Sequence, residues 1–206
     1  MKNGKRLKIA ALVLLCAGLW CWRYFSFNAE IAEIYTPKRA YYAMNEAVDY
    51  AENIVNLHSY RDCSLTLLSA RLIAAEDFCR EFSLPEISEW DDAQRLAADG
   101  KLCMIEVEFY NGAEKTMAFD IMDAPLYGRD MALSMSPFVI EINPVLRASG
   151  GSVVELAPGA SERILLPYVL SRAAFTDAEW QSVGEYPLFL FVTQFPEERV
   201  VRIAYS

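Results

Sequence analysis

The chain has 206 residues, of which 54% are apolar and 23% are charged, and this composition excludes an intrinsically disordered chain and a polytopic membrane protein. The formal charge of −9 hides an asymmetry. Residues 1–27 contain five of the 19 basic residues and no acidic one, which leaves 14 basic against 28 acidic residues, or −14, in the remainder. So acidic a remainder excludes nucleic-acid binding, which needs clustered Lys and Arg.

A basic stretch followed by an apolar run opens the chain. Four basic residues between Lys2 and Lys8 precede the run at residues 9–27, which only Arg23 interrupts. As an α-helix this run would be about 28 Å long, close to the ~30 Å thickness of a bilayer core. The excess of positive charge before it places the N-terminus in the cytoplasm. We therefore predict a cytoplasmic basic tail at 1–8, a transmembrane signal anchor at 9–27, and a single-pass protein of the cell membrane with its C-terminal part extracytoplasmic.

Two alternatives to an uncleaved anchor fit the same residues less well. A cleaved signal peptide needs small residues at its cleavage site. Cys16 and Gly18 would serve, but tryptophans follow directly. A lipoprotein needs a small residue before its lipidated cysteine, whereas Leu15 precedes Cys16 and Trp20 precedes Cys21. An uncleaved anchor is the preferred interpretation.

Residues 28–61 fit two descriptions. The stretch from Ala40 to Leu57 has apolar residues at helical spacing, and it could equally be a stalk that leads into a first short strand. No Gly/Ser- or Pro-rich linker marks a second domain. We therefore predict a stalk or N-terminal extension at 28–61 and one extracytoplasmic β-sandwich domain at 62–206.

Strand and helix signals follow from Cys63 onward. The pattern predicts a strand from Cys63 to about Ile73 and a helix at Ala74–Phe82, which Pro85 ends. A second short helix is expected at Asp91–Gly100, with acidic residues at its start and a glycine at its end.

The clearest strand signal spans Leu102–Tyr110. Its odd-numbered positions are apolar and two even-numbered positions are glutamates, which predicts one face toward the core and one toward water. These residues are Cys103, Ile105, Val107 and Phe109 on one face, and Glu106 and Glu108 on the other. Asn111-Gly112 is a strong turn signal, so Thr116–Ile121 is expected to return as a strand.

The last third of the chain shows short strands separated by turns. Pro167 marks an edge strand or a bulge, because proline cannot donate to the ladder. Thr176 to Glu179 has the form of a capping box that opens a brief helix around Trp180. The fold class predicted is mainly β, a two-sheet sandwich with short helical insertions. The further strands expected are Phe138–Ile142, Ser152–Leu156, Arg163–Leu170, Tyr186–Thr193 and Val200–Tyr205.

Several segments together resemble a known family. They are, besides the anchor, Leu65–Phe82, Val-Glu-Phe-Tyr-Asn111, Asn143-Pro144, Ala157-Pro-Gly159, Leu166-Pro-Tyr168, Trp180 and Tyr-Pro-Leu-Phe-Leu190. The chain is similar to a family of small membrane-anchored extracytoplasmic proteins of Gram-positive bacteria, a domain of unknown function with an immunoglobulin-like layout. The resemblance covers Cys63 to the C-terminus and implies location and fold. It carries over no catalytic residue.

Catalytic motifs are not found in the sequence. His58 is the only histidine, so any Ser-His-Asp or Cys-His arrangement must use it, and no Gly-x-Ser-x-Gly elbow accompanies it. A structural or exposed role is the preferred interpretation. A single histidine also excludes histidine-rich metal sites, and there is no Gly-rich phosphate loop. No cofactor is expected, and the protein is expected not to be an enzyme.

Acidic residues give two further hypotheses. Asp120, Asp123 and Asp130 could supply oxygen ligands to a calcium ion, although their spacing matches no EF-hand loop. Glu106 and Glu108 could form a glycosidase pair, but two such carboxylates on one strand usually form the wet face of a sheet. Solvated acidic residues are the preferred interpretation in both cases.

Three cysteines lie after the anchor. Cys63, Cys79 and Cys103 can form at most one internal disulfide, whose pairing the sequence leaves open. Cys103 faces the predicted core, so a buried inert thiol is its expected state.

The leading functional hypothesis is a non-enzymatic binding or structural module of unknown ligand, held at the membrane by its N-terminal helix, with an envelope protein as candidate partner and no nucleic acid. Its contacts would come from loops or from an exposed sheet edge near Pro167. An apolar patch would support it, with Phe175, Trp180, Tyr186 and Phe189 as candidates. The alternatives are an envelope enzyme or enzyme accessory with an acidic, calcium-binding site, and a small subunit of a membrane complex.

Overall fold

The computed structural model describes residues 13–28, 38–85, 100–129 and 131–205. The chain divides into two units, Met1–Pro37 and Lys38–Ser206. In the first unit residues 13–28 are helical. Among the helices of the described residues, none has the length and apolar character that a membrane span requires. The first residues of the expected anchor at 9–27, and all of the helix expected at Asp91–Gly100 except its last residue, lie outside the described residues.

The compact unit Lys38–Ser206 includes residues 38–61, so this part of the expected stalk or extension belongs to the same unit as the strands that follow. The helical interpretation of Ala40–Leu57 is wrong, because the segment forms short strands. Asn45, Ala51 and Asn56 adopt φ angles of 65°, 47° and 52°. Left-handed residues do not continue a right-handed helix, so each of them turns the chain between two strands.

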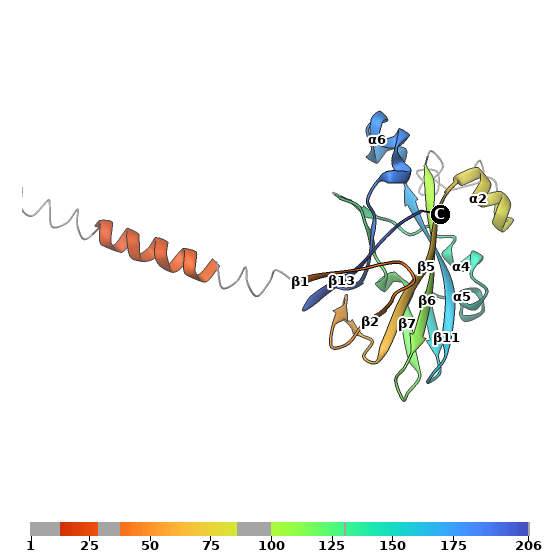
Figure 1. The fold of residues 1–206 in the computed structure, drawn as a ribbon, viewed down its shortest axis with the longest axis horizontal. Coiled ribbons are helices and arrows are strands. Elements are labelled where there is room, and N and C mark those ends of the chain that lie inside the picture. The colour runs from red at the N-terminus through yellow and green to blue at the C-terminus, as the bar shows by residue number, and fades with distance from the viewer. Residues whose placement is uncertain (1–12, 29–37, 86–99, 130, 206) are drawn as a thin grey trace, which may run out of the picture. The chain divides into compact units, whose positions relative to one another are not determined.

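The first sheet, here called sheet A, has five strands in the order β1-β13-β12-β8-β9. β1 runs parallel to β13, and the other pairs are antiparallel. β1 and β13 lie side by side in Figure 1. The strands of sheet A are β1 (Lys38–Tyr42), β8 (Leu126–Tyr127), β9 (Ala132–Leu133), β12 (Phe189–Thr193) and β13 (Glu197–Arg202).

The second sheet, sheet B, has four antiparallel strands in the order β11-β6-β5-β2. Two short pairs complete the β structure, β7 with β10 and β3 with β4. The strands of sheet B are β2 (Ala47–Asp49), β5 (Cys63–Ala74), β6 (Lys101–Asn111) and β11 (Ser161–Leu170). The short pairs are β3 (Ile54–Val55) with β4 (His58–Ser59), and β7 (Met117–Asp120) with β10 (Val153–Leu156).

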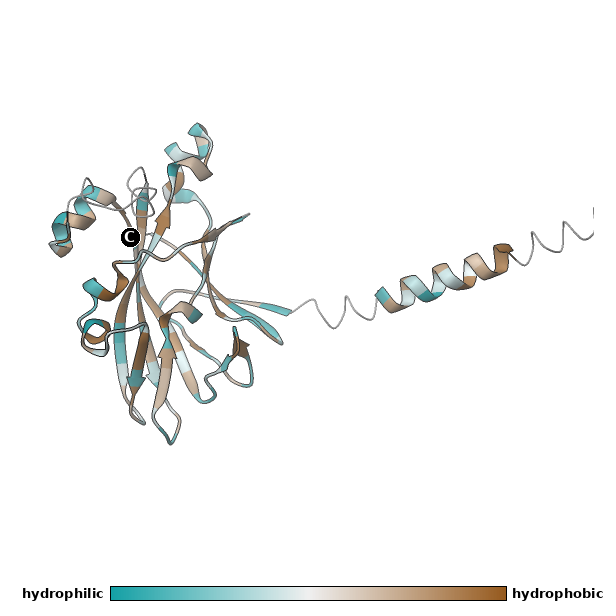
Figure 2. Ribbon diagram, turned by 180° about the vertical axis from the view of Figure 1, so that it is seen from behind, coloured by the Kyte–Doolittle hydropathy of each residue, from teal (hydrophilic) through white to brown (hydrophobic). Residues whose placement is uncertain are grey.

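The core lies between these layers. The predicted face of β6 is confirmed, since Cys103, Ile105, Val107 and Phe109 are at most 1% exposed. They belong to one buried cluster that also contains Phe119 of β7 and side chains of β10 and sheet A. Hydrophobic and hydrophilic residues alternate along the strands in Figure 2, as expected for strands with one face in a core. The predicted mainly β fold is therefore confirmed, as two packed β layers.

Helices cover the other face of sheet B at one end. Here Leu102 and Met104 of β6 are also buried and form a second cluster with Phe78 of α2. The helix predicted at Ala74–Phe82 is thus confirmed as α2. Figure 1 shows α4 and α5 beside β11. The helices are α2 (Ala75–Phe82), α4 (Val139–Ile142), α5 (Pro144–Ser149) and α6 (Asp177–Gln181), with 3-10 turns η2 (Ile121–Asp123), η3 (Arg172–Ala174) and η4 (Val183–Glu185).

The strand predicted at Phe138–Ile142 is wrong, because this run forms α4. A short apolar run with a single polar residue, Glu141, does not distinguish a strand from a buried helix. Val139 and Ile142, three residues apart, both face the protein interior. The Asn143 side chain ends the helix by donating to the Val139 carbonyl at 2.7 Å. The predicted capping box is confirmed, since Thr176 and Glu179 exchange both hydrogen bonds at the start of α6.

Pro167 does lie in an edge strand, β11, as predicted. The exposed sheet edge expected there is wrong, because other segments cover it. Ser136 N donates to the Pro167 carbonyl at 2.6 Å. The Asn143 side chain donates to the Leu165 carbonyl at 2.8 Å and accepts from its N–H at 2.9 Å, as a neighbouring strand would. The chain itself therefore satisfies this edge.

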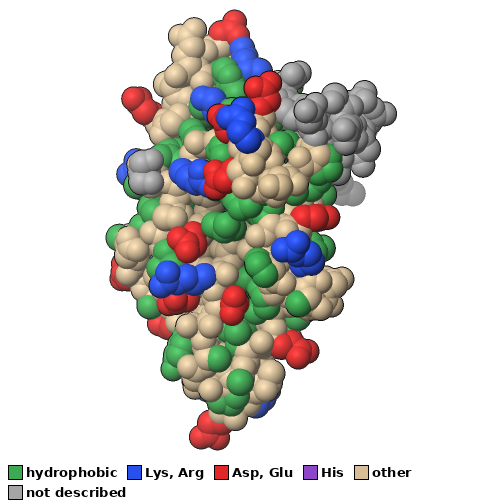
Figure 3. All heavy atoms as spheres, turned by 90° about the vertical axis from the view of Figure 1, so that its right-hand side faces the viewer, with side chains coloured by type: hydrophobic (Ala, Val, Ile, Leu, Met, Phe, Trp, Pro, Cys, Tyr) green, Lys and Arg blue, Asp and Glu red, His purple; other side chains and the backbone are tan. Residues whose placement is uncertain are grey.

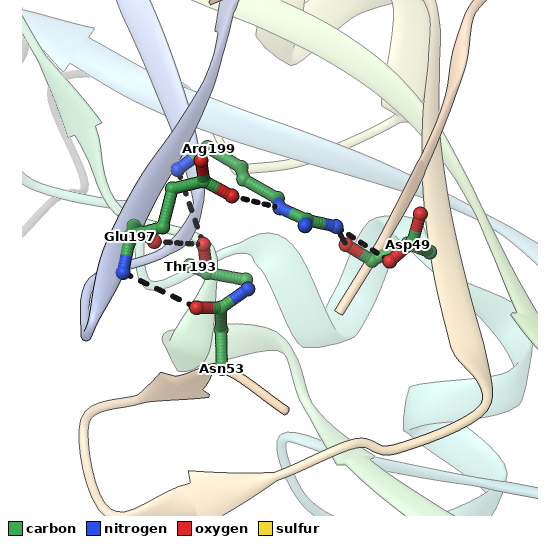
Figure 4. A network of polar contacts seen from close by, with 5 residues as sticks. All are labelled: Asp49, Asn53, Thr193, Glu197 and Arg199. Carbon is green, nitrogen blue, oxygen red and sulfur yellow. Dashed lines mark hydrogen bonds and ion pairs between the residues drawn. The ribbon is translucent and has the colours of Figure 1, made fainter. Parts of the chain in front are cut away.

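A polar network joins sheet A to the other edge of sheet B (Figure 4). Arg199 on β13 donates from Nη1 to the backbone carbonyl of Asp49 on β2 at 2.8 Å and to its carboxylate at 2.5 Å. Its Nε binds Glu197 at 2.9 Å. Two side chains bind the backbone of Glu197: the Thr193 hydroxyl donates to its carbonyl, and the Asn53 side chain accepts from its N–H. The Arg199 side chain is only 16% exposed, so this network connects the two layers at a largely buried position.

Figure 3 shows the face that looks to the right in Figure 1, where acidic and basic side chains lie next to each other between small hydrophobic areas. Such mixing is typical of a solvated surface. The exposed aromatic residues that bear on function are found in sheet A.

Candidate binding groove

An open groove of about 890 Å³ lies at one end of sheet A. Three segments line it: residues 41–44 after the middle of β1, residues 184–187 before β12, and residues 202–205 at the end of β13. Its volume is in the range of pockets that bind small ligands or short chain segments. We call it the tyrosine groove, after its five aromatic residues, which are Tyr41, Tyr42, Tyr186, Phe189 and Tyr205.

The first wall comes from β1. The parallel register places Tyr41 beside Val200 of β13, on the outer face of sheet A. Its ring packs edge-on against Phe189 of β12, with 6.0 Å between the ring centroids. Tyr41 nevertheless remains 63% exposed. An aromatic side chain held by a neighbouring ring and still open to solvent is available to a ligand.

The second wall centres on Tyr186, which is fixed from two sides. Its ring meets Phe175 edge-on at 5.2 Å, and its hydroxyl accepts from Arg129 N at 3.2 Å. The ring also fills the space beside Gly128, where a Cβ atom would lie 2.6 Å from it. Gly128 is therefore required for Tyr186 to reach its place.

The floor is the end of the chain. Ile203 N donates to the Leu188 carbonyl at 2.9 Å, and Ala204 N lies 3.2 Å from Met44 Sδ. These contacts tie the floor to both walls. The backbone of the groove is thus built by the fold, and Tyr41, Glu185 and Arg202 are the large side chains of its lining that are exposed.

Two charged residues line the groove, Glu185 and Arg202. Both are exposed, and within the described part of the chain neither has an ion-pair partner. The outer face of sheet A continues from the groove with Phe191 and Tyr127, whose rings meet edge-on at 4.7 Å. Arg39 lies over the Phe191 ring at 5.3 Å. Exposed tyrosine with arginine is the composition that interface centres favour.

The four aromatic residues proposed from sequence for an apolar patch divide into two pairs. Tyr186 and Phe189 line the groove. Phe175 is buried, and Trp180 is half-buried against it with 5.6 Å between the ring centroids. Sequence reasoning missed Tyr41, because residues 28–61 were expected to form a stalk or N-terminal extension outside the β-sandwich domain. The only signal for it was the pair Tyr41-Tyr42 itself.

The three aspartates proposed for calcium are not brought together as one site by the described residues. The Asp120 side chain accepts from Met122 N at 3.0 Å and caps η2. Asp123 is 5% exposed and points to the β3–β4 hairpin. Asp130 lies outside the described residues. Within those residues no group of three metal-ligating side chains is found, and calcium binding stays a prediction.

Asp123 instead holds the hairpin that carries the single histidine. Its carboxylate accepts hydrogen bonds from Asn56 Nδ2 and the Tyr60 hydroxyl, and meets His58 Nδ1, each at 2.5 Å. Burial, and then the hydrogen bond to Asp123, raise the pKa of Tyr60 well above its ordinary value. The Tyr60 hydroxyl therefore stays protonated and donates a hydrogen bond to the Asp123 carboxylate. We name Asn56, His58, Tyr60 and Asp123 the hairpin cluster.

The two glutamates of β6 lie where the wet-face interpretation put them. Glu106 accepts from the Ser69 hydroxyl at 3.2 Å. Glu108 forms an ion pair with Arg163 of β11 at 3.0 Å. Each carboxylate is occupied by a neighbouring strand, so the two form surface contacts of sheet B.

Cys63, Cys79 and Cys103 are buried free thiols. Burial raises the pKa of Cys79 and of Cys63 above the ordinary value. For Cys103 burial raises the pKa from 9.0 to about 12, and contact with the Tyr205 hydroxyl offsets this only in part. A protonated, enclosed thiol is a poor nucleophile, which agrees with the inert state expected for Cys103.

The Cys103 pKa leads to a measurable pH dependence. Above pH ~9 the unfolded chain releases this proton while the folded chain keeps it. The free energy of unfolding is therefore expected to fall as pH rises from about 9 toward 12, by up to ~1.4 kcal/mol per pH unit from this group. Urea unfolding of the protein and of Cys103→Ala at about pH 8 and about pH 10 measures the difference. Equal pH slopes in the two proteins would contradict the prediction.

Comparison with known proteins adds the following. The model of the family described as "Domain of unknown function (DUF5028)" matches residues 39–199. No curated protein matches the sequence.

The chain is similar to three solved structures at 10% sequence identity. An uncharacterized β-sandwich protein from Clostridium difficile 630 has a TM-score of 0.44, covering 81% of this chain and 95% of its own. The yjhA protein from Bacillus subtilis has a TM-score of 0.42, with 79% and 98% covered. A functionally unknown protein from Listeria monocytogenes EGD-e has a TM-score of 0.45, with 72% and 79% covered.

Proposed function

The chain belongs to the DUF5028 family, whose description assigns no activity, and we propose from its geometry that it is a membrane-tethered extracytoplasmic binding module. The domain holds its ligand, part of an envelope protein, in the tyrosine groove. The observation that carries this proposal is the groove itself, where Tyr41 is 63% exposed on an otherwise packed sheet. Large exposed aromatic surface at a concave site marks binding sites.

The location rests on the N-terminal sequence. Basic residues at 2–8 followed by the apolar run at 9–27 support an uncleaved signal anchor with the N-terminus in the cytoplasm. The proposed orientation puts the compact domain outside the cytoplasm, in the envelope of a Gram-positive cell. An immunoglobulin-like arrangement is proposed for the sandwich, and the parallel pairing of the first strand with the last supports it.

A non-enzymatic role is proposed because of what the groove presents. Its polar groups are tyrosine hydroxyls, one glutamate and one arginine. Glu185 and Arg202 have no ion-pair partner among the described residues that would orient them for proton transfer. General acid–base chemistry needs such positioned partners, whereas ligand binding needs only the rings and the rim.

Photo-crosslinking in cells tests the proposal. A benzophenone amino acid replaces Tyr41 in the groove of the full-length protein, and in a matched variant it replaces Tyr110, which is 43% exposed on β6 and lies outside the groove. We expect one reproducible envelope-protein adduct from position 41 and none from position 110. Mass spectrometry of the adduct identifies the partner. Equal adducts at both positions, or none at either, would contradict the proposed function.

A further inference from the structure

The floor of the tyrosine groove has no free strand edge. β13 lies between β1 and β12, so its backbone is paired on both sides. Beyond the strand, Ile203 N is bonded to the Leu188 carbonyl. β13 therefore cannot accept an added β-strand, which needs unpaired backbone groups, and at this side of sheet A such groups remain only on the outer edge of β1 among the described residues.

On the floor, recognition has to come from side chains, and the rings are the largest of these. The rings of Tyr41 and Phe189, which contact each other, line the groove together with Tyr186 and Pro187, and Tyr41 is open to solvent. Aromatic-lined grooves of this kind suit polyproline II segments, whose backbone needs no ladder and whose conformation is already fixed before binding. The pyrrolidine rings pack on tyrosine faces, and little conformational entropy is lost.

The polar groups of the groove match the same ligand. A proline-rich segment presents carbonyl acceptors and few N–H donors. The groove offers donors, namely the Arg202 guanidinium and the hydroxyl of the exposed Tyr41.

The charge of the rim and of the domain adds one feature. Glu185 is exposed and has no ion-pair partner among the described residues. The sequence after residue 27 carries −14 in total, from 14 basic and 28 acidic residues. A basic residue beside the proline-rich stretch can pair with Glu185, and the negative potential of the acidic domain attracts it.

We propose that the tyrosine groove binds a proline-rich, polyproline II segment that carries a flanking basic residue and belongs to a partner protein. This inference rests on the proposed function, since it names the ligand class of the same groove.

Fluorescence anisotropy of the full chain in detergent tests the proposal. The probe is a labelled peptide of one arginine followed by about nine prolines, and the control peptide replaces the prolines by Gly and Ser, which remain flexible. We expect saturable binding of the proline peptide only. Tyr41→Ala should weaken it about tenfold, while Tyr110→Ala, on exposed β6 surface outside the groove, should change it less than about twofold.

A charge reversal provides the second arm. Glu185→Lys should weaken binding of the arginine peptide by about fivefold and should favour a probe whose arginine is replaced by glutamate. Equal binding of the Gly/Ser peptide, no effect of Tyr41→Ala, or binding of the neutral sugar cellohexaose in place of the peptide would overturn the inference. If the peptide did not bind but position 41 still gave a specific adduct in cells, the ligand class would be wrong and the proposed function would stand. If the peptide did not bind and position 41 gave no adduct, the ligand class and the proposed function would both be wrong.

Discussion

Replacing Phe119 by alanine is expected to lower the free energy of unfolding by about 3–5 kcal/mol. Phe119 is 0% exposed and is the centre of an aromatic cluster between the layers. Its ring stacks on Tyr60 at 5.0 Å and meets Phe109 of sheet B at 5.2 Å. Removing it leaves a cavity that the surrounding strands cannot close, because ladder bonds to β10 fix β7 and ladder bonds to β5 and β11 fix β6. Urea unfolding followed by tryptophan fluorescence measures the loss.

Two further variants serve as comparisons for the loss of unfolding free energy expected in Phe119→Ala. Phe119→Leu retains most of the volume and should cost about 1–2 kcal/mol. Tyr110→Ala removes an aromatic ring next to Phe109 in sequence, but this ring is 43% exposed, so its loss should cost less than ~1 kcal/mol. If Phe119→Ala were no more destabilising than Tyr110→Ala, the cluster would not be the centre of the core.

The second large effect is expected in the hairpin cluster. Asp123→Ala should lower the free energy of unfolding by about 2–4 kcal/mol, because it removes the acceptor of three donors at a 5% exposed position. The buried Tyr60 hydroxyl loses the acceptor of its proton. The β3–β4 hairpin, which carries Asn56 and His58, loses its main attachment to η2. Amide hydrogen exchange should therefore accelerate in residues 54–59 more than in β6.

Asp120→Ala is the matched control for that change. Asp120 lies three residues before Asp123, and its side chain accepts only from Met122 N at the surface. A lost cap of this kind should cost about 0.5–1 kcal/mol. Similar losses for Asp120→Ala and Asp123→Ala, or unchanged exchange in the hairpin, would contradict the role given to Asp123.

The long strands of sheet B were predictable from sequence because their pattern is local. β6 alternates apolar residues with Glu106 and Glu108, and Asn111-Gly112 marks its end. The structure gives this turn a further cause. The Asn111 side chain donates to the carbonyls of Lys115 and Leu156, and Gly112 lies where a Cβ atom would be 2.4 Å from the Asp62 carbonyl. A turn signal in the sequence was thus also a tertiary contact.

The candidate site was less predictable because it is assembled from distant parts of the chain. Tyr41 and Tyr186 lie 145 positions apart by their numbers, and the parallel pair of β1 with β13 sets the spacing of the groove walls. Sequence periodicity carries no information on such a pairing. The same holds for Asp123, whose partners in the hairpin are more than 60 positions away. Its role as a hairpin anchor follows from tertiary structure alone.

Backbone groups on both edges of sheet B are occupied by other parts of the chain, which bears on how copies of this protein behave when crowded together. On β11 the Ser136 N–H and the Asn143 side chain occupy backbone groups that a foreign strand would need. On β2, which is only three residues long, Arg199 occupies the Asp49 carbonyl. Exposed strand edges are templates for polymerisation between molecules. These contacts leave fewer backbone groups of sheet B available to a second molecule, which lowers the tendency of crowded copies to join through this sheet.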